Sequence, residues 1–237
     1  MEVSAAVAAV LAAAVPREVG NMHELGKKFL TKEEQNKVTE AVKQAELLTS
    51  GEIVPMIVSH SYDYPKARLA GALLFSLPAT FVLTQLLALL FWLNADNVYV
   101  FFSFFAPLFT AFYFLTGRYP VIAKFLISRE EMEKEVEEEA VKSFFSEKLY
   151  TTRDNNGVLL FISVFEKKAW ILVDHGVEKK INQKIWDEMV NELTAKIARN
   201  EHCEALCNTI EQIGAVLQQN FPYKKDDTDE LHNLIVK

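Results

Sequence analysis

Two polar turns contain side chains that could bind a cation or move a proton. Asp154, Asn155 and Asn156 precede one strongly apolar run, and Asp174 and His175 follow the next. If the two runs pair as an antiparallel hairpin, these side chains converge at one end of the sheet. Carboxylate and amide oxygens are ligands that Ca²⁺ and Mg²⁺ prefer. We predict a candidate metal site at Asp154, Asn155, Asn156 and Asp174, with Asp174 and His175 as candidate catalytic residues.

The same residues are also common in turns that have no catalytic role. Asp and Asn at strand ends often bond to nearby backbone groups, and Gly176 can supply a positive φ. His175 could act as a general acid or as a nucleophile toward phosphate, although most histidines in loops are simply solvated. The sequence leaves both interpretations open.

A second set of possible ligands is His202, Cys203 and Cys207. A structural zinc needs a fourth ligand, and Cys203 falls on an apolar helical stripe, which favours packing in the core. Two cysteines form no disulfide framework, so a reducing compartment is compatible. The sequence has no P-loop, dinucleotide fingerprint, nucleophile elbow or cysteine-phosphatase motif.

The turns are positioned by elements that the sequence indicates. A capping box at Thr31 and Glu34 begins a helix, and the strand "EIVPMIVS" follows it. Pro55 suggests that this strand lies at an edge or contains a bulge. The runs "VLLFISVF" and "AWILV" predict an antiparallel hairpin at the centre of the sheet.

Three further helices are predicted from their apolar spacing. One begins near Arg129 and has seven Glu residues between Glu130 and Glu139, which we interpret as a solvated outer face. Two others bear stripes from Trp186 to Ile197 and from Cys203 to Leu217. The order of elements predicts an α/β sandwich around a small mixed sheet.

Two uncharged runs interrupt this domain after its first strand. Leu69–Leu93 has twenty-five residues and Val98–Leu115 has eighteen, whereas a membrane span needs roughly 20. We predict a transmembrane helical hairpin that contacts the lipid bilayer through residues 69–115.

Positive charge near the span ends predicts the orientation of the hairpin. The charges that flank it are Lys66, Arg68, Arg118, Lys124 and Arg129, whereas the turn between the runs carries only Asp96. Cytoplasmic flanks have the excess of Lys and Arg, so we predict an integral inner- or cell-membrane protein with its termini and α/β domain in the cytoplasm.

The first residues contain an apolar stretch, Val7–Val15, but no leading Lys or Arg, so we favour a disordered or weakly helical extension over a signal peptide. A net charge of −7 argues against a nucleic-acid partner. The predicted segments are an N-terminal extension at 1–29, the first part of the domain at 30–66, the hairpin at 67–118, the rest of the domain at 119–220, and a tail at 221–237.

Several strings together resemble the TPM domain family, especially its small bacterial membrane-integrated branch: "TSGEIV", "NNGVLLFISVFEKKAWILVDHGV", "IGAVLQQNFP" and "DDTDEL". The Asn-Gly opening of the family's central strand matches Asn156-Gly157. The family's Gly-aromatic-Gly loop is Asp174-His175-Gly176 here, and Asn182 stands where many relatives have Asp.

The resemblance implies a three-layer TPM-like sandwich. Some members of the family are reported to be acid phosphatases or to bind calcium, and others act as accessory factors for membrane complexes. We therefore predict a membrane-anchored adaptor for a membrane-protein partner. The alternative is a phosphatase at the membrane surface that is assisted by Ca²⁺ or Mg²⁺.

Overall fold

The computed structural model describes residues 25–91, 98–119, 126–223 and 231–237. They form two compact units, which we describe separately. The hairpin unit lies within Asp63–Met132, and the sheet unit within His23–Tyr62 and Glu133–Lys237. The predictions for the N-terminal residues 1–24, for the turn at 94–97, for Lys124 and for residues 224–230 of the tail fall outside the described residues.

The sheet has four strands in the order β3-β2-β1-β4. β1 (Glu52–Val58) runs parallel to β2 (Gly157–Ser163) and to β4 (Ile235–Val236), and β2 pairs antiparallel with β3 (Lys168–Val173). Every residue of β1 and β2 is buried, as their continuous apolar sequences require. The predicted β2–β3 hairpin is confirmed. Its predicted central place is wrong, because β3 forms an edge of the sheet and the central pair is β1 and β2.

Pro55 lies in an inner strand that pairs with β2 in continuous register, so neither the predicted edge position nor the predicted bulge is found. The backbone of neighbouring Ile57 faces β4, since its carbonyl accepts the Lys237 N–H at 2.9 Å, and Ser59 N–H donates to the Lys237 carbonyl at 3.0 Å. The nitrogen of Pro55 faces the same side, because alternate residues of a strand do. β4 pairs with β1 only from Met56 onward, so no strand residue lies opposite the Pro55 nitrogen. The missing N–H of proline therefore costs the sheet no hydrogen bond.

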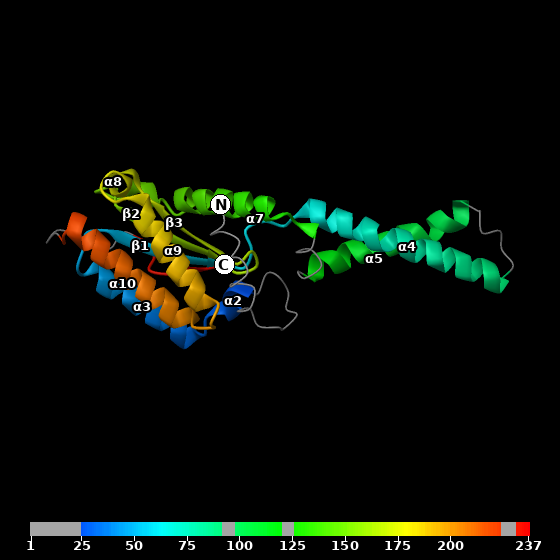
Figure 1. Cartoon of the computed structure of the whole chain (residues 1–237), viewed down its shortest axis with the longest axis horizontal. Helices are drawn as coiled ribbons and strands as arrows, with labels where there is room; N and C mark the ends of the chain where they lie inside the picture. Colours follow the sequence, from blue (N-terminus) through cyan, green and yellow to red (C-terminus); the bar gives the residue numbers. More distant parts are fainter. Residues whose placement is uncertain (1–24, 92–97, 120–125, 224–230) are drawn as a thin grey trace. The chain divides into compact units, whose positions relative to one another are not determined.

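Helices cover both faces of the sheet (Figure 1). α3 (Lys32–Glu46), α9 (Gln183–Ile197) and α10 (His202–Asn220) pack on one face. α7 (Arg129–Ser146) and the short 3-10 helix η2 (Leu149–Thr151) pack on the other. The strands alternate their side chains between two buried cores, so Ile53 and Leu160 face the three helices whereas Val54 and Phe161 face α7. The predicted three-layer α/β sandwich is confirmed.

Four short elements were not predicted: α2 (Leu25–Phe29), η2, α8 (His175–Glu178) and β4. α2 falls within the extension that we predicted to be disordered or weakly helical, and its five residues form a short helix. The Gly26 N–H donates to Ser59 Oγ at 2.9 Å and fixes α2 beside the end of β1. β4 lies in the predicted tail, and its two residues extend the sheet.

The hairpin unit contains α4 (Pro65–Phe91) and α5 (Val98–Arg118), which pack along each other (Figure 1). Gly71 permits a close approach, because a Cβ there would lie 2.7 Å from the Thr116 methyl group. Phe75 and Phe112 stack across the pair with ring centroids 5.8 Å apart. The two helices therefore make one side-chain interface with each other and leave their other faces open.

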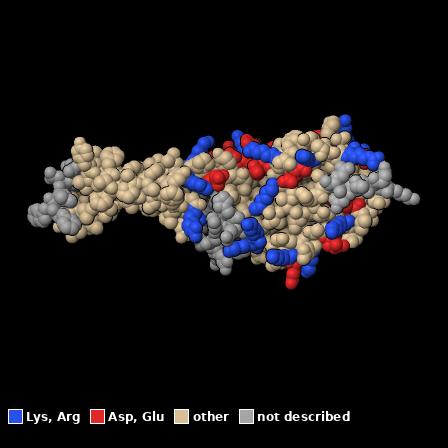
Figure 2. Space-filling model, turned by 180° about the vertical axis from the view of Figure 1, so that it is seen from behind, with Lys and Arg blue, Asp and Glu red and all other residues tan. Residues whose placement is uncertain are grey.

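Both helices are long and apolar enough to cross a membrane. At about 1.5 Å per residue, the twenty-one residues of α5 reach about 31 Å, which matches a hydrocarbon core of about 30 Å. Their large side chains are exposed in the structure: Leu89 is 78% exposed and Phe114 is 70% exposed. Figure 2 shows the hairpin as a surface without Lys, Arg, Asp or Glu over most of its length. The core of a soluble domain would bury such residues, so their exposure favours a lipid environment.

Candidate functional site

Asp174 is the residue where β3 ends and α8 begins. Its Oδ1 accepts the His175 N–H at 2.7 Å, which makes Asp174 the N-cap of α8. Its own N–H donates to the Gly157 carbonyl at 2.9 Å. The residue is 8% exposed, and its Oδ2 is buried with no hydrogen-bond partner among the described residues. One oxygen thus has a structural role, and the other is left for a further partner.

The two predicted turns do meet in space. A Cβ on Gly176 would lie 2.4 Å from the Asn155 carbonyl oxygen and 3.1 Å from that of Asp154. Only glycine leaves room for this close approach of backbone to backbone. Asn155 itself has a φ of 51°, a left-handed conformation that Asn adopts more readily than most residues. Asp154 and Asn155 therefore lie beside the Asp174–Gly176 turn, as the predicted hairpin requires.

Asn156 points to a different partner. Its side-chain amide donates to the Ser50 carbonyl, and the residue is 2% exposed. Its backbone N–H donates to Thr152 Oγ1 at 3.1 Å. Asn156 therefore joins the entry of β2 to the chain that enters β1, and this bond already uses its amide nitrogen.

His175 lies at the surface. Its side chain is 69% exposed, and Nδ1 is 3.6 Å from Glu178 Oε2, one turn further along α8. Among the described residues, Glu178 is the one acid or base that pairs with the His175 ring. The arrangement is that of a solvated histidine on a short helix.

A metal at these turns would rely mainly on backbone oxygens. Within the described ranges, no group of three or more His, Cys, Asp or Glu side chains could hold a metal ion. Asp174 Oδ2 and the carbonyls of Asp154 and Asn155 are hard ligands of the kind that Ca²⁺ accepts. A Ca²⁺ site needs about six to eight oxygens, so these residues do not complete one.

The alternative zinc set is a packed helix start. Burial and, to a smaller extent, neighbouring Cys203 together raise the pKa of the Cys207 thiol to about 11, so the thiol stays protonated. Cys203 Sγ lies 3.9 Å from the Glu34 carbonyl. Burial lowers the pKa of His202, and the nearby Glu34 carboxylate opposes that shift. These groups contact α2 and α3 and do not form a ligand cluster.

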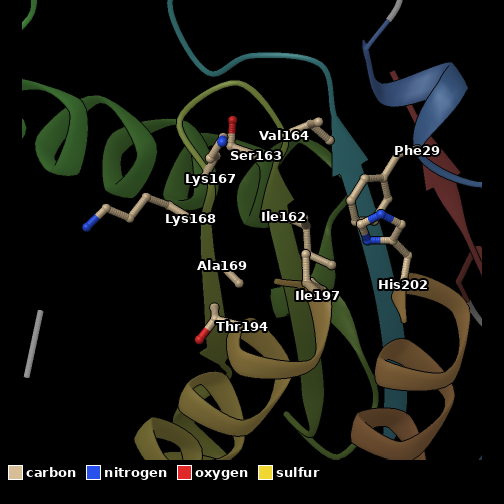
Figure 3. A pocket seen from close by; sticks show the side chains of 10 residues that line it. All are labelled: Phe29, Ile162, Ser163, Val164, Lys167, Lys168, Ala169, Thr194, Ile197 and His202. Carbon is tan, nitrogen blue, oxygen red and sulfur yellow. The ribbon is translucent and has the colours of Figure 1, made fainter. Parts of the chain in front are cut away.

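An apolar pocket lies at the opposite end of the sheet (Figure 3). Its empty volume is about 330 Å³, part of which is open to solvent. Phe29 and His202 form one wall, with ring centroids 4.5 Å apart. The two hydroxyl groups on its lining already have partners, since Ser163 Oγ donates to Glu166 and Thr194 Oγ1 donates to the Asn191 carbonyl. The lining thus offers packing surface and no acid, base and nucleophile set.

Glu166 is a buried acid that the sequence analysis treated only as part of a polar turn. It is 4% exposed and accepts the Ser61 N–H at 3.0 Å as well as the Ser163 hydroxyl. Glu166 therefore ties the β2–β3 turn to the segment that follows β1. A lone acid in a tight turn gives no indication in the sequence of such a distant partner.

The fold and the two turns define an α/β sandwich with a two-helix insertion. Residues 124–216 match the family model of the TPM domain, so the chain carries a TPM domain. It is also similar to the NMR structure of the BA42 protein from the psychrophilic bacterium Bizionia argentinensis, at 23% identity and a TM-score of 0.53. That likeness covers 88% of this chain and 94% of the BA42 chain, and it shows a shared fold. The search of curated proteins gave no match.

Proposed function

We propose that the protein is a membrane-anchored adaptor whose TPM domain supports the assembly or maintenance of a membrane-protein complex from the cytoplasmic side. The observation that carries the proposal is the place of the hairpin. α4 and α5 lie in the sequence between β1 and α7, so the chain enters and leaves the apolar helices from within one sheet unit. An anchor with two connections restrains a domain near the membrane more tightly than one at a chain end.

The orientation rests on charge. Lys66, Arg68 and Arg118 stand at the same end of the two helices, and the positive-inside rule assigns that end to the cytoplasm. Reporter fusions test it. An alkaline phosphatase inserted between Ala95 and Asp96 should be active outside the cell, and one fused after Lys237 should be inactive. The opposite pattern would place the TPM domain outside and end the proposal of a cytoplasmic adaptor.

The adaptor role is tested in native membranes. The membranes are solubilised mildly after chemical cross-linking, and the chain is followed by native electrophoresis. An adaptor co-migrates with a larger complex at a fixed molar ratio to it. Deletion of the gene for the adaptor lowers the amount of that complex. Migration only as the free chain, in cells where the tagged chain is folded and membrane-bound, would reject the adaptor.

The second candidate is a phosphatase assisted by a divalent cation. Its specific support is Asp174 Oδ2, which is buried without a hydrogen-bond partner among the described residues. A cation that binds only the native state raises the melting temperature with its occupancy. We would compare melting with Ca²⁺, Mg²⁺ and Mn²⁺ for the wild type and Asp174→Asn, and measure hydrolysis of p-nitrophenyl phosphate alongside.

The outcomes of that comparison separate the candidates. A shift that disappears in Asp174→Asn, together with turnover that needs the same cation, would support the phosphatase. Equal melting with and without each cation in folded protein would remove the metal-assisted enzyme and leave the adaptor standing.

A further inference from the structure

The outer face of α7 has an apolar patch that the fold does not use. Val141 is 38% exposed, Phe145 is 57% exposed and Tyr150 of η2 is 46% exposed. The Phe145 and Tyr150 rings lie 5.4 Å apart, so the three side chains form one surface, which we call the α7 patch. All three belong to the sheet unit.

The α7 patch is separate from the stripe that packs on the sheet. Val136, Ala140 and Phe144 lie one helical repeat apart and are buried against the strands. Phe145 lies about 100° further around the helix than Phe144, and Val141 lies on the same side four residues earlier. A helix that only covers a sheet needs one apolar stripe, whereas α7 adds an exposed apolar pair, Val141 and Phe145, in its C-terminal half.

Acidic side chains flank the patch. Glu137 and Glu138 stand four and three residues before Val141, which places them beside it on the helix. Both are exposed, and Lys142 lies only 4.0 Å from Glu138. Over the whole of α7 the acidic residues outnumber the basic ones, with seven Glu residues against Arg129, Lys134 and Lys142. Figure 2 shows acidic side chains along the upper edge of the sheet unit, where Figure 1 draws α7.

We propose that the α7 patch binds a basic amphipathic helix from a membrane-protein partner, with its apolar stripe against Val141, Phe145 and Tyr150 and its Lys and Arg side chains against Glu137 and Glu138. The proposal rests on the adaptor function and names the chemistry of its partner. The cytoplasmic flanks of membrane spans are rich in Lys and Arg, so segments of this chemistry are abundant where the adaptor would work. Amphipathic helices commonly bind apolar surfaces through side chains at helical spacing.

Charge complementarity selects this occupant over two others. A second copy of the chain, related by a two-fold axis along α7, would bring the Glu residues of one patch against those of the other. An anionic lipid surface would repel the same residues, since it attracts basic segments. A basic helix is the occupant for which both the apolar and the charged parts of the surface are favourable.

The direct test uses the full-length protein in detergent and a labelled synthetic peptide. The peptide is an eighteen-residue design with Leu at helical spacing on one face and Lys or Arg on the other, and binding is followed by fluorescence anisotropy. A control peptide keeps the Leu stripe and replaces every basic residue by Glu. The basic peptide should bind, its affinity should fall as NaCl is raised, and the acidic peptide should bind at least about tenfold more weakly.

Matched variants locate the binding surface. Val141→Ser/Phe145→Ser and Glu137→Lys/Glu138→Lys should each weaken binding of the basic peptide about tenfold or more. Leu47→Ser/Leu48→Ser, at exposed apolar positions elsewhere, and Glu188→Lys, at an exposed acid on α9, should leave it unchanged. Unchanged melting temperatures show that every variant is folded.

Three results would overturn the inference. The first is equal binding of both peptides, and the second is full binding by folded Val141→Ser/Phe145→Ser. The third is a concentration-dependent dimer, measured by light scattering, that these substitutions abolish, because the patch would then serve a second copy. Co-migration with a complex in native membranes decides the adaptor separately. If folded Val141→Ser/Phe145→Ser still co-migrates, the adaptor stands and its binding surface lies elsewhere.

Discussion

The two faces of the sheet are covered in different ways. Three helices, α3, α9 and α10, share one face, and each directs a single apolar stripe inward. On the other face α7 and η2 carry apolar side chains that point inward and others, at the α7 patch, that stay exposed. Within the three helices of the first face, Ile185 is the one large apolar side chain that is exposed, at 37%. The second has apolar surface beyond what its core needs, which is the pattern expected of an interaction surface.

The largest effects should come from the inner sides of both faces. Trp186 of α9 is 1% exposed and packs in the core between the three helices and the sheet, and Phe161 of β2 is 0% exposed beneath α7. Replacing either by Ala should lower the free energy of unfolding by about 3–5 kcal/mol, since both substitutions leave a large cavity. Denaturant unfolding of the full-length protein, followed by circular dichroism, measures both. A loss below about 1 kcal/mol for Phe161→Ala alone would mean that α7 packs loosely.

An intermediate effect is expected at the start of α3. The Thr31 N–H donates to Glu34 Oε2 at 2.8 Å, which lowers the pKa of Glu34, and the Glu34 N–H donates to Thr31 Oγ1 at 3.3 Å. Thr31→Ala should cost about 1 kcal/mol of stability, and Thr31→Ser, which keeps the hydroxyl, should cost much less. The same unfolding assay compares the two. Equal losses would show that the hydroxyl is not what stabilises α3.

A smaller, pH-dependent effect should belong to the three-helix face. Burial lowers the pKa of His202 below its ordinary 6.5, against the opposing influence of Glu34. The unfolded chain therefore binds more protons than the folded one just below pH 6.5, so this contribution to stability is lost as the pH falls through that range. His202→Gln should flatten the melting temperature between pH 7 and 5. The control is His232→Gln at an exposed position, and identical pH profiles for both variants would contradict the assignment.

The smallest effect on stability is predicted at the outer side of α7. Phe145→Ser should change the free energy of unfolding by no more than about 0.5 kcal/mol, because the side chain is 57% exposed. The comparison with Phe161→Ala contrasts a side chain of β2 that is buried beneath α7 with a side chain on the outer surface of α7. A loss of several kcal/mol for Phe145→Ser would mean that this ring supports the fold, and the two faces would then differ less than we infer.

The sequence predicted the long elements because their periodicity is set by burial. The buried run in β2 and the stripes of α9 and α10 appear directly in the residue pattern. The two residues of β4 could not be predicted, since so short a strand exists only through its pairing with β1. The edge position inferred from Pro55 was wrong for the same reason. An inner strand tolerates a proline where the neighbouring strand is too short to pair with it, and the residue pattern of β1 does not show the length of β4.

The meeting of the two turns was predicted, whereas the partners of their side chains were not. The hairpin register correctly placed Asp154 and Asn155 beside Gly176. It could not tell that the Asn156 amide bonds to Ser50, about a hundred residues earlier in the chain. Turn residues and cation ligands are the same residue types, so only the direction of each side chain separates the two roles.

The parallel pairing of β1 with β2 has a consequence for how the chain folds. Glu52 pairs with Gly157, so about a hundred residues must be made before the central pair can close. Arg68 and Gly117 are neighbours at the base of the hairpin, so a formed hairpin shortens this loop to about half its length. The entropic saving is only about 0.6 kcal/mol, but the order of events changes. Until β2 has been made, β1 has no parallel partner. A hairpin that fails to form would leave the full loop to be closed, so a defect in α4 or α5 would also slow the pairing of β1 with β2.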